Sequence, residues 1–371
     1  MNPEAAPPHA TTGPVHIVGA GLIGASVGLG LRQLGLEVTL EDPSPAAAAV
    51  AEQVGAGRRR QPKDPEPQVV VVAVPPDVTA NVVAQALARF SAATVTDAAS
   101  VKAVILEELT QLGADLSRYV GSHPMAGRER SGPAAGSGDL FVGRPWVITA
   151  NPATAPERVL QIRHLATDLG AHPTFLDAAT HDTSVALVSH LPQILSSLTA
   201  ARLVQAEAGA LDLAGQGLRD VTRIAGSDPE LWSAILVGNG PAVAAVLREV
   251  QADLAHAIGA LEMGTAPATL GQSLKTLADL VAQGRRGAER IPGKHGGARR
   301  QFDRVTVMVP DRPGALGELF QEMGRLGVNL EDLKLEHGMG QLVGLAEVWV
   351  PLGQGAPLAA DLEEQGWRIL K

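Results

Sequence analysis

A short apolar run, a glycine-rich turn and an apolar helical pattern follow one another at residues 15–35, "VHIVGAGLIGASVGLGLRQLG". The glycines have the G-x-G-x-x-G spacing, in which the first makes a tight turn, the second lets a pyrophosphate approach the backbone, and the third lets helix pack on strand. Free N–H groups at the start of such a helix bind phosphate. The stretch predicts the first strand–turn–helix of a Rossmann-type α/β domain. The residues expected against a dinucleotide are Gly19, Gly21, Leu22, Ile23 and Gly24.

An acidic pair ends the next expected strand, "LEVTLED" at 36–42. An acid at this point binds the hydroxyl groups of the adenosine ribose, and we predict Asp42 for this role with Glu41 as the alternative. A carboxylate repels a 2′-phosphate, so NAD is the expected cofactor. The basic run Arg58–Arg60 leaves NADP open.

Two further runs have the composition of buried parallel strands, "QVVVVAVPP" at 68–76 and "ATVTDAAS" at 93–100. The prolines direct the chain out of the sheet, which places Val74 and Pro75 at the cofactor. Ligands of open α/β sheets lie beyond the carboxyl ends of the strands, where this chain has three polar candidates. These are Asp97, Ser100 and His123. Ser100 has a second interpretation, as the N-cap of a helix that it opens.

The composition excludes several classes of protein. The net charge of −9 argues against a nucleic-acid partner, which would need a concentrated basic surface. The chain has no cysteine, so we expect no disulfide and no thiolate site, and no metal site is predicted. Residues 1–13 read as a disordered lead without the features of a signal peptide, and no apolar run is long enough to span a membrane. We therefore expect a cytoplasmic protein.

With 371 residues the chain is long enough for two or three domains. We expect the dinucleotide-binding domain at 14–176 and an all-α domain at 177–288, with helices that are largely buried, apolar enough to need a covering partner, and kinked at Pro192. A Gly- and Arg-rich linker at 289–300 follows. Residues 301–371 predict a βαββαβ unit, which suggests a ferredoxin-like sandwich.

Four motifs, together with the glycine turn, resemble the prephenate dehydrogenase family of tyrosine biosynthesis. The resemblance covers roughly residues 14–290 and rests on "TDAASVK", "GSHPMAGRERSG", "HDTSVALVSHLPQIL" and "GLRDVTRIAGSDPELW", in this order. It implies NAD-dependent oxidative decarboxylation of prephenate. His123 would be the general base, acting as a neutral imidazole with a pKa near neutrality, and Ser100 would orient it and contact the same substrate hydroxyl. The helical domain would form a homodimer.

The resemblance also implies how the dianionic substrate is held. Arg223 would grip a carboxylate with its planar fork, and Asp220 and Glu129 would form an ionic network that controls access. His190 would line the substrate pocket, and Trp232 would complete that pocket from a neighbouring subunit. At the other end of the chain, "DRPGALGEL" and "LGVNLEDL" resemble the ACT domain, a module that commonly binds amino acids. Its effector pocket would lie around three residues, and tyrosine is the expected effector. They are Asp311, Gly314 and Asn329.

Three alternatives remain open at this point. An arogenate dehydrogenase would differ only in the substrate side chain, which carries an amine in place of the keto group. A β-hydroxyacid dehydrogenase would need a catalytic lysine, for which Lys102 and Lys275 are poor candidates. A non-catalytic sensor would bind NAD and an amino acid without turnover, and it would have no need of a base such as His123.

Overall fold

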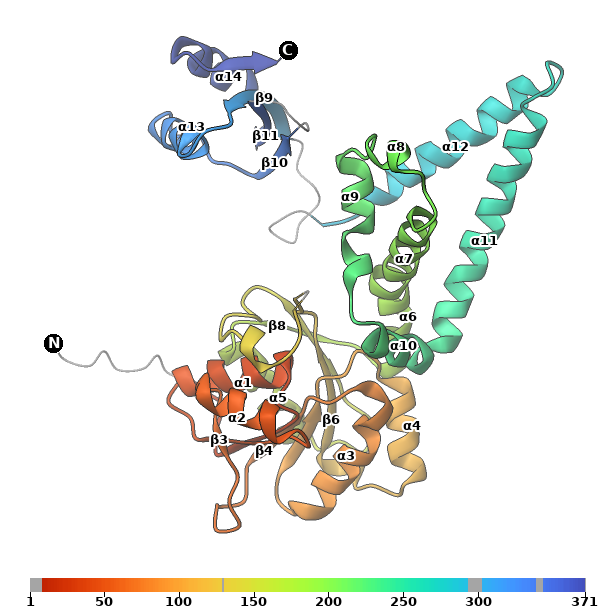
Figure 1. Ribbon diagram of the computed structural model, residues 1–371. Coiled ribbons are helices and arrows are strands. Elements are labelled where there is room, and N and C mark those ends of the chain that lie inside the picture. The colour runs from red at the N-terminus through yellow and green to blue at the C-terminus, as the bar shows by residue number, and fades with distance from the viewer. Residues whose placement is uncertain (1–8, 129, 293–301, 338–342, 371) are drawn as a thin grey trace. The chain divides into compact units, whose positions relative to one another are not determined.

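The computed structural model describes residues 9–128, 130–292, 302–337 and 343–370 (Figure 1). The chain divides into two compact units, Met1–Gln251 and Ala252–Lys371. Each unit is described by itself below.

An eight-stranded sheet forms the centre of the first unit. Its strand order is β3-β2-β1-β4-β5-β6-β7-β8, and all neighbours are parallel except β6 and β7. Since β1 pairs with β2 on one side and with β4 on the other, a crevice opens beyond the carboxyl ends of β1 and β4. The strands are β1 (Val15–Val18), β2 (Val38–Glu41), β3 (Arg58–Arg59), β4 (Val69–Val72), β5 (Thr94–Asp97), β6 (Tyr119–Pro124), β7 (Pro145–Thr149) and β8 (His172–Phe175).

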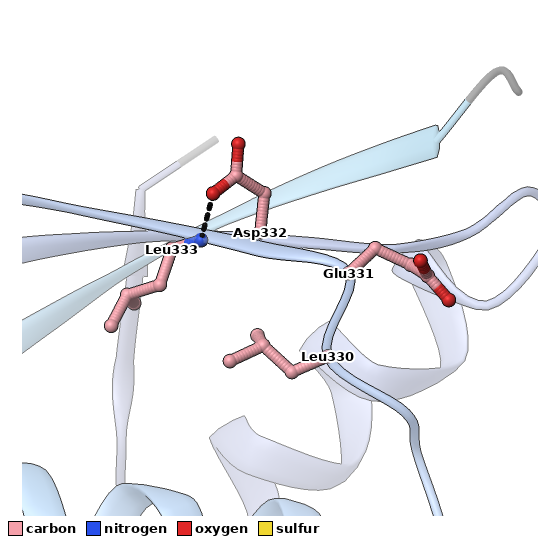
Figure 2. Close-up of a pocket in the computed structure, with 4 residues that line it drawn as sticks. All are labelled: Leu330, Glu331, Asp332 and Leu333. Carbon is pink, nitrogen blue, oxygen red and sulfur yellow. Dashed lines mark hydrogen bonds between the residues drawn. The ribbon is translucent and has the colours of Figure 1, made fainter. Parts of the chain in front are cut away.

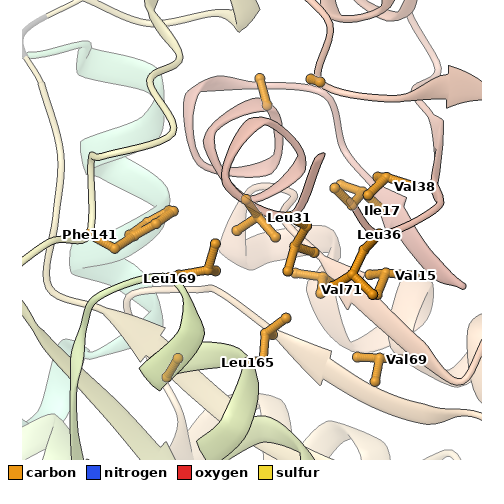
Figure 3. Close-up of a cluster of buried hydrophobic side chains, with 14 of the residues drawn as sticks. Val15, Ile17, Leu31, Leu36, Val38, Val69, Val71, Phe141, Leu165 and Leu169 are labelled. Carbon is orange, nitrogen blue, oxygen red and sulfur yellow. The ribbon is translucent and has the colours of Figure 1, made fainter. Parts of the chain in front are cut away.

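Helices cover both faces of this sheet, because β4 is apolar on both of its sides. Val69 and Val71 belong to the cluster of buried side chains under α1 and α5, which Figure 3 shows, whereas Val70 and Val72 belong to the cluster under α3 and α4. The alternation follows from the two-residue period of a strand. The helices and short 3-10 turns around the sheet are α1 (Leu22–Gln33), α2 (Pro45–Gln53), α3 (Pro76–Arg89), α4 (Ala103–Gln111), η1 (Leu116–Arg118), η2 (Pro133–Ala135) and α5 (Pro156–Asp168).

Helices follow the sheet along the chain. The expected kink at Pro192 takes the form of a π-helical turn, because Pro192 lies in the first turn of α7 and cannot donate a backbone hydrogen bond to the turn before it. The elements are α6 (Ala178–Val185), the π turn η3 (Ala186–His190), α7 (Leu191–Leu203), α8 (Ala208–Leu211), α9 (Gln216–Thr222), the 3-10 turn η4 (Arg223–Gly226), α10 (Pro229–Gly238) and α11 (Gly240–Met263), which runs into the second unit.

The apolar side chains of α7 and its surroundings are not largely buried within one chain, contrary to the expectation. Val188 is 63% exposed, Leu198 is 54% exposed and Val204 is 83% exposed. Exposed large apolar side chains concentrated on one helical segment indicate an interface with another protein surface.

The N-terminal lead is anchored in its described part. Ala10 and Thr11 donate backbone hydrogen bonds to Asp168 Oδ2 at 3.0 and 2.7 Å, and the Thr11 hydroxyl donates to the same oxygen at 2.6 Å. Thr11 is buried. Residues 9–13 therefore differ from the disordered lead that the composition predicts.

In the second unit, a four-stranded antiparallel sheet has the order β10-β11-β9-β12 and buries Val307, Leu319 and Ala346 among its core residues. Its βαββαβ element order is the one expected for residues 301–371. The assignment as an ACT domain stays a prediction. The elements are α12 (Leu270–Glu289), β9 (Phe302–Pro310), α13 (Ala315–Arg325), β10 (Asp332–His337), β11 (Val343–Pro351), α14 (Gly355–Glu364) and β12 (Arg368–Leu370).

No single helix in the described ranges is long and apolar enough to cross a membrane; α10 and α11 meet the length and composition requirement only as a pair, bent by 93°.

Replacing Leu165 by alanine should lower the free energy of unfolding by about 2–5 kcal/mol, because its side chain is fully buried and the substitution leaves a cavity. Leu160→Ala on the same helix is the matched control: this side chain is 44% exposed, so the loss should stay within about 0.5 kcal/mol. Urea unfolding followed by circular dichroism measures both. Equal losses in the two variants would contradict this core.

Candidate active site

The glycine turn leaves the start of α1 open. Gly19 has a φ of +99°, and a Cβ there would lie 2.3 Å from the Ala73 carbonyl oxygen; a Cβ on Gly24 would lie 1.9 Å from that of Gly19. A Cβ on Gly21, by contrast, meets no protein atom within 4 Å. Gly21 is the N-cap of α1, without a side-chain hydrogen bond. The backbone N–H groups of the first turn are therefore available to an anionic group.

A cavity of about 600 Å³ adjoins this turn and is lined by Gly19, Gly21, Asp42, Val74 and Pro75 among others. Five of the eight predicted cofactor residues thus line one cavity. Leu22, Ile23 and Gly24 form the first turn of α1 beside it.

Asp42 is held at the cavity by the glycine turn itself. Its Oδ2 accepts a hydrogen bond from the Ala20 backbone at 2.7 Å, and its Oδ1 accepts one from the Ser44 backbone at 2.8 Å. Each carboxylate oxygen can accept a further bond, so a ribose hydroxyl fits this donor set. The dinucleotide would be held by the open α1 start, Gly21 and Asp42.

Glu41, the alternative ribose acid, has two side-chain partners. Its carboxylate accepts from Arg89 at 3.0 Å and lies 3.4 Å from His16 Nε2. The interaction with His16 foremost, supported by Arg89, lowers the pKa of Glu41 to about 2. Glu41 and Asp42 line the same cavity, and the assignment of the ribose contact to Asp42 stays a prediction.

The basic run Arg58–Arg60, which kept NADP as an alternative cofactor, also interacts with other groups of the protein. Arg58 bridges Asp64 and Glu37, and Arg59 pairs with Glu52. Arg60 donates to two backbone carbonyl groups and lies over a phenylalanine ring. All three guanidinium groups thus have partners within the protein.

His123 lies near the carboxyl end of β6, inside the strand and not in a loop, because β6 continues antiparallel to β7 as far as Pro124. Its side chain is buried, with 8% of the residue exposed. Burial foremost, and then the nearby His181 and Lys102, hold the pKa of His123 well below its usual 6.5. The pKa is lower than the near-neutral value expected, and the imidazole is neutral at pH 7.

The hydrogen-bond partner of His123 is another histidine. His123 Nδ1 lies 2.9 Å from His181 Nε2, and His181 Nδ1 lies 2.7 Å from Asp182 Oδ1. Asp182 also accepts from the backbone N–H groups of Lys102 and Ala103, at 2.9 and 2.8 Å. Asp182 thereby caps the start of α4 from a distant part of the chain.

The alternative interpretation of Ser100 as a helix N-cap is wrong. Helix α4 begins at Ala103, and Asp182 satisfies its first N–H groups, so no serine hydroxyl is needed there. Ser100 is half-buried. Within the described residues no hydrogen bond joins Ser100 to His123, and its role toward the substrate stays a prediction.

A second buried polar cluster lies on the same strands. Lys102 forms an ion pair with Asp97, which also accepts from the Tyr119 hydroxyl at 2.7 Å. A Cβ on Gly121 would lie 2.4 Å from Thr149 Oγ1, so a larger residue at this position would collide with β7. Burial lowers the pKa of Lys102, and the Asp97 carboxylate opposes that shift. Lys102 is thus an interior cation and not a residue of an exposed helix face.

His190 ends the π turn and is almost fully buried. Its Nδ1 lies 3.1 Å from Asn239 Nδ2, which also donates to the Asp182 backbone carbonyl at 2.7 Å. Burial lowers the pKa of His190 to about 4. The Trp232 ring packs edge-on against the His190 ring of the same chain, with the ring centroids 6.0 Å apart. Its contribution to the pocket of a neighbouring subunit stays a prediction.

Arg223, the residue predicted to bind a substrate carboxylate, lies next to a residue that is hydrogen-bonded to the helix following His190. Arg223 opens η4, and Gln193, one turn after His190, donates from Nε2 to the Ile224 carbonyl at 3.0 Å. Asp220 is exposed and accepts from Gln216 at 2.7 Å. The remaining member of the predicted ionic network, Glu129, lies outside the described residues.

Sequence reasoning missed four buried residues of this site. Lys102 and His181 were dismissed or left without a role, and Asp182 and Asn239 were not considered. A signal for two of them was present, since His181 and Asp182 are adjacent polar residues in the motif "HDTSVALVSHLPQIL". A buried polar pair in such a pattern indicates specific partners.

A dinucleotide cavity at the switch point of the sheet, with a buried neutral histidine at the end of a nearby strand, defines a nicotinamide-dependent dehydrogenase of the Rossmann type. Family models agree. The prephenate dehydrogenase nucleotide-binding domain matches residues 27–174, and the prephenate dehydrogenase dimerization domain matches residues 177–276. The chain belongs to the prephenate dehydrogenase family.

Individual relatives extend this result. The chain is 37% identical over 322 residues to a probable prephenate dehydrogenase NovF of Streptomyces niveus, covering 86% of this chain and 89% of that protein. The structure is similar to A. aeolicus prephenate dehydrogenase in complex with hydroxyphenyl propionate and NAD+, with a TM-score of 0.62, 26% identity, and coverage of 72% and 97%. It is also similar to Synechocystis arogenate dehydrogenase, with a TM-score of 0.57, 27% identity, and coverage of 72% and 99%.

Gly21→Ala should weaken NAD binding by at least about tenfold while leaving the free energy of unfolding nearly unchanged, because its Cβ would occupy space that only the ligand uses. Gly24→Ala should instead cost about 1–3 kcal/mol of stability, since its Cβ would collide with a backbone carbonyl. Isothermal titration with NAD and urea unfolding separate the two effects. Wild-type affinity in Gly21→Ala would contradict the cofactor site.

Proposed function

We propose that the protein catalyses the NAD-dependent oxidative decarboxylation of prephenate to 4-hydroxyphenylpyruvate, with His123 as its general base. The observation that carries this proposal is the buried, neutral imidazole at the end of β6 in a chain of this family. A neutral imidazole can accept a proton at pH 7, as the reaction requires.

His123 takes the proton of the C4 hydroxyl. Bound NAD supplies the hydride acceptor for this step, in which C4 becomes a phenolic carbon, the ring carboxylate leaves as CO2, and the ring becomes aromatic. The low pKa of His123 keeps the base unprotonated before the substrate binds. Two carboxylates of the arriving substrate would raise this pKa by favouring the imidazolium ion, which strengthens the base when it is needed.

Arg223 is the proposed partner of a substrate carboxylate. The side chain stands at the junction of α9 and η4, and the hydrogen bond from Gln193 to Ile224 holds this junction against the helix that carries His190. Asp220 and Glu129 remain the proposed ionic network around it, and Ser100 the proposed second contact of the substrate hydroxyl.

The choice between prephenate and arogenate is part of this proposal. The two substrates share the ring, its carboxylate and its hydroxyl, so the same base serves both. The similarity to an arogenate dehydrogenase keeps that substrate as the second candidate. A β-hydroxyacid dehydrogenase is disfavoured, because it would need a catalytic lysine and Lys102 is held in a buried ion pair with Asp97.

A homodimer is the proposed assembly. The exposed apolar side chains of the helical region are unfavourable in water unless another surface buries them. This region matches the dimerization domain of the family. A second copy of the same surface would bury them.

An amino-acid effector, tyrosine, is proposed for the C-terminal unit. Gly314 starts α13 with a φ of +89°, which favours glycine. Asn329 donates a hydrogen bond to Glu331 at 3.0 Å. The four residues that follow Asn329 in the sequence line a cavity of about 410 Å³ (Figure 2); they are Leu330, Glu331, Asp332 and Leu333. Asp311 precedes α13 in the same unit. An effector with ammonium, carboxylate and ring groups could use these polar and apolar groups together.

Purified protein should reduce NAD with prephenate, and His123→Asn should lower kcat by at least about 10²-fold, because the variant has no base at this position. Arogenate is assayed in parallel, and thermal unfolding checks that the variant is folded. Absence of turnover of either substrate by the wild type would overturn the proposed function. Faster turnover of arogenate would replace the proposed substrate by the second candidate.

Saturating tyrosine should lower turnover and raise Tm, because a ligand that binds only the folded state stabilises it. Asn329→Ala should lose both responses and keep its basal kcat, and phenylalanine serves as the ligand control. Unchanged turnover and Tm with tyrosine would show that the C-terminal unit has another role.

A further inference from the structure

The partners of Asp182 determine where the proton sits on His181. Both carboxylate oxygens already accept from backbone N–H groups, those of Lys102 and Ala103, which cannot accept a proton in return. A proton on the carboxyl group would compete with these bonds. The carboxylate therefore accepts from His181, whose Nδ1 lies 2.7 Å away and must carry the proton.

The same logic continues to His123. A neutral imidazole has one donor and one acceptor nitrogen, so a proton on His181 Nδ1 leaves His181 Nε2 as an acceptor. His123 Nδ1, 2.9 Å away, must then donate. Its other nitrogen, Nε2, is left unprotonated. A doubly protonated His181 would reverse this order, but it would place a positive charge on a fully buried ring.

A second set of hydrogen bonds determines which nitrogen of His190 carries the proton. Asn239 Nδ2 lies 2.7 Å from the Asp182 backbone carbonyl, an acceptor only, so the orientation of the amide is determined. The second proton of the same amide nitrogen faces His190 Nδ1 at 3.1 Å. His190 Nδ1 is therefore the acceptor. Because burial keeps this ring neutral, its single proton is on Nε2.

We infer that Asp182 holds His123 and His190 in opposite tautomers, through His181 on one side and Asn239 on the other. His123 presents an unprotonated Nε2, and His190 presents a protonated one. The role of this arrangement rests on the proposed function: His123 accepts the substrate proton, and His190 offers a hydrogen-bond donor without a positive charge. His181 and Asn239 are positioning residues, which act through the two rings.

Nitrogen NMR of the imidazole rings tests the tautomers directly in the full-length protein at neutral pH, without cofactor or substrate. Spectra of His123→Asn and His190→Asn identify the two rings among the ten histidines. We expect His123 to be protonated at Nδ1 only and His190 at Nε2 only. A proton on His123 Nε2, or on His190 Nδ1, would overturn the inference.

A pair of substitutions at His181 tests the role in catalysis. His181→Leu removes the acceptor for His123 Nδ1 and should lower kcat by at least about 10²-fold, with KM and the Kd for NAD changed by less than about threefold. His181→Gln keeps an amide oxygen that can accept from His123, so it should recover most of kcat. His172→Gln, at an exposed histidine on β8, is the matched control and should behave as the wild type.

The outcomes separate the two proposals. An active wild type with an unchanged kcat in His181→Leu would overturn the positioning role alone. An inactive wild type would overturn the proposed function, and the NMR tautomers would still decide the structural inference. Should His181→Leu fail to fold, the spectra of the wild type and the kcat of His181→Gln carry the test.

Discussion

The buried carboxylate of Asp182 is the interaction on which the arrangement of the site depends. Its two oxygens accept three N–H groups, two at the start of α4 and one from His181, and its own backbone carbonyl accepts from Asn239. A buried charge is tolerated only when such donors satisfy it. One residue of α6 thereby links the start of α4 to both buried histidines.

Burial gives this site its electrostatic character. Water exclusion strengthens each hydrogen bond and makes an unpaired polar group costly, which is why Asp182, Lys102 and Asp97 all have close partners. Lys102, Asp97 and Tyr119 form one such cluster, and burial raises the pKa of Tyr119 well above its usual value. The same burial keeps His123 and His190 neutral. In the proposed mechanism the two histidine rings are neutral, and Arg223 supplies the positive charge that binds the dianionic substrate.

The cofactor side of the site could be predicted from the sequence because its causes are local. Gly19 and Gly24 lie within one turn, and each is required by a close backbone contact within a few residues or with one neighbouring strand. The position of Asp42 follows from the same unit, since it binds the backbone of Ala20. His123 could be placed at a strand end for a similar reason, although its strand extends further than expected.

By itself the sequence determined the Rossmann-type turn and the series of strands and helices, because periodicity and glycine spacing act over short stretches. Only the tertiary structure decided which polar groups meet. His181 lies 58 residues from His123 along the chain, and Asp182 lies about eighty from the helix it caps. No local pattern encodes those pairings; they arise when packing brings α6 against β6 and α4 and removes the water that would otherwise satisfy each group.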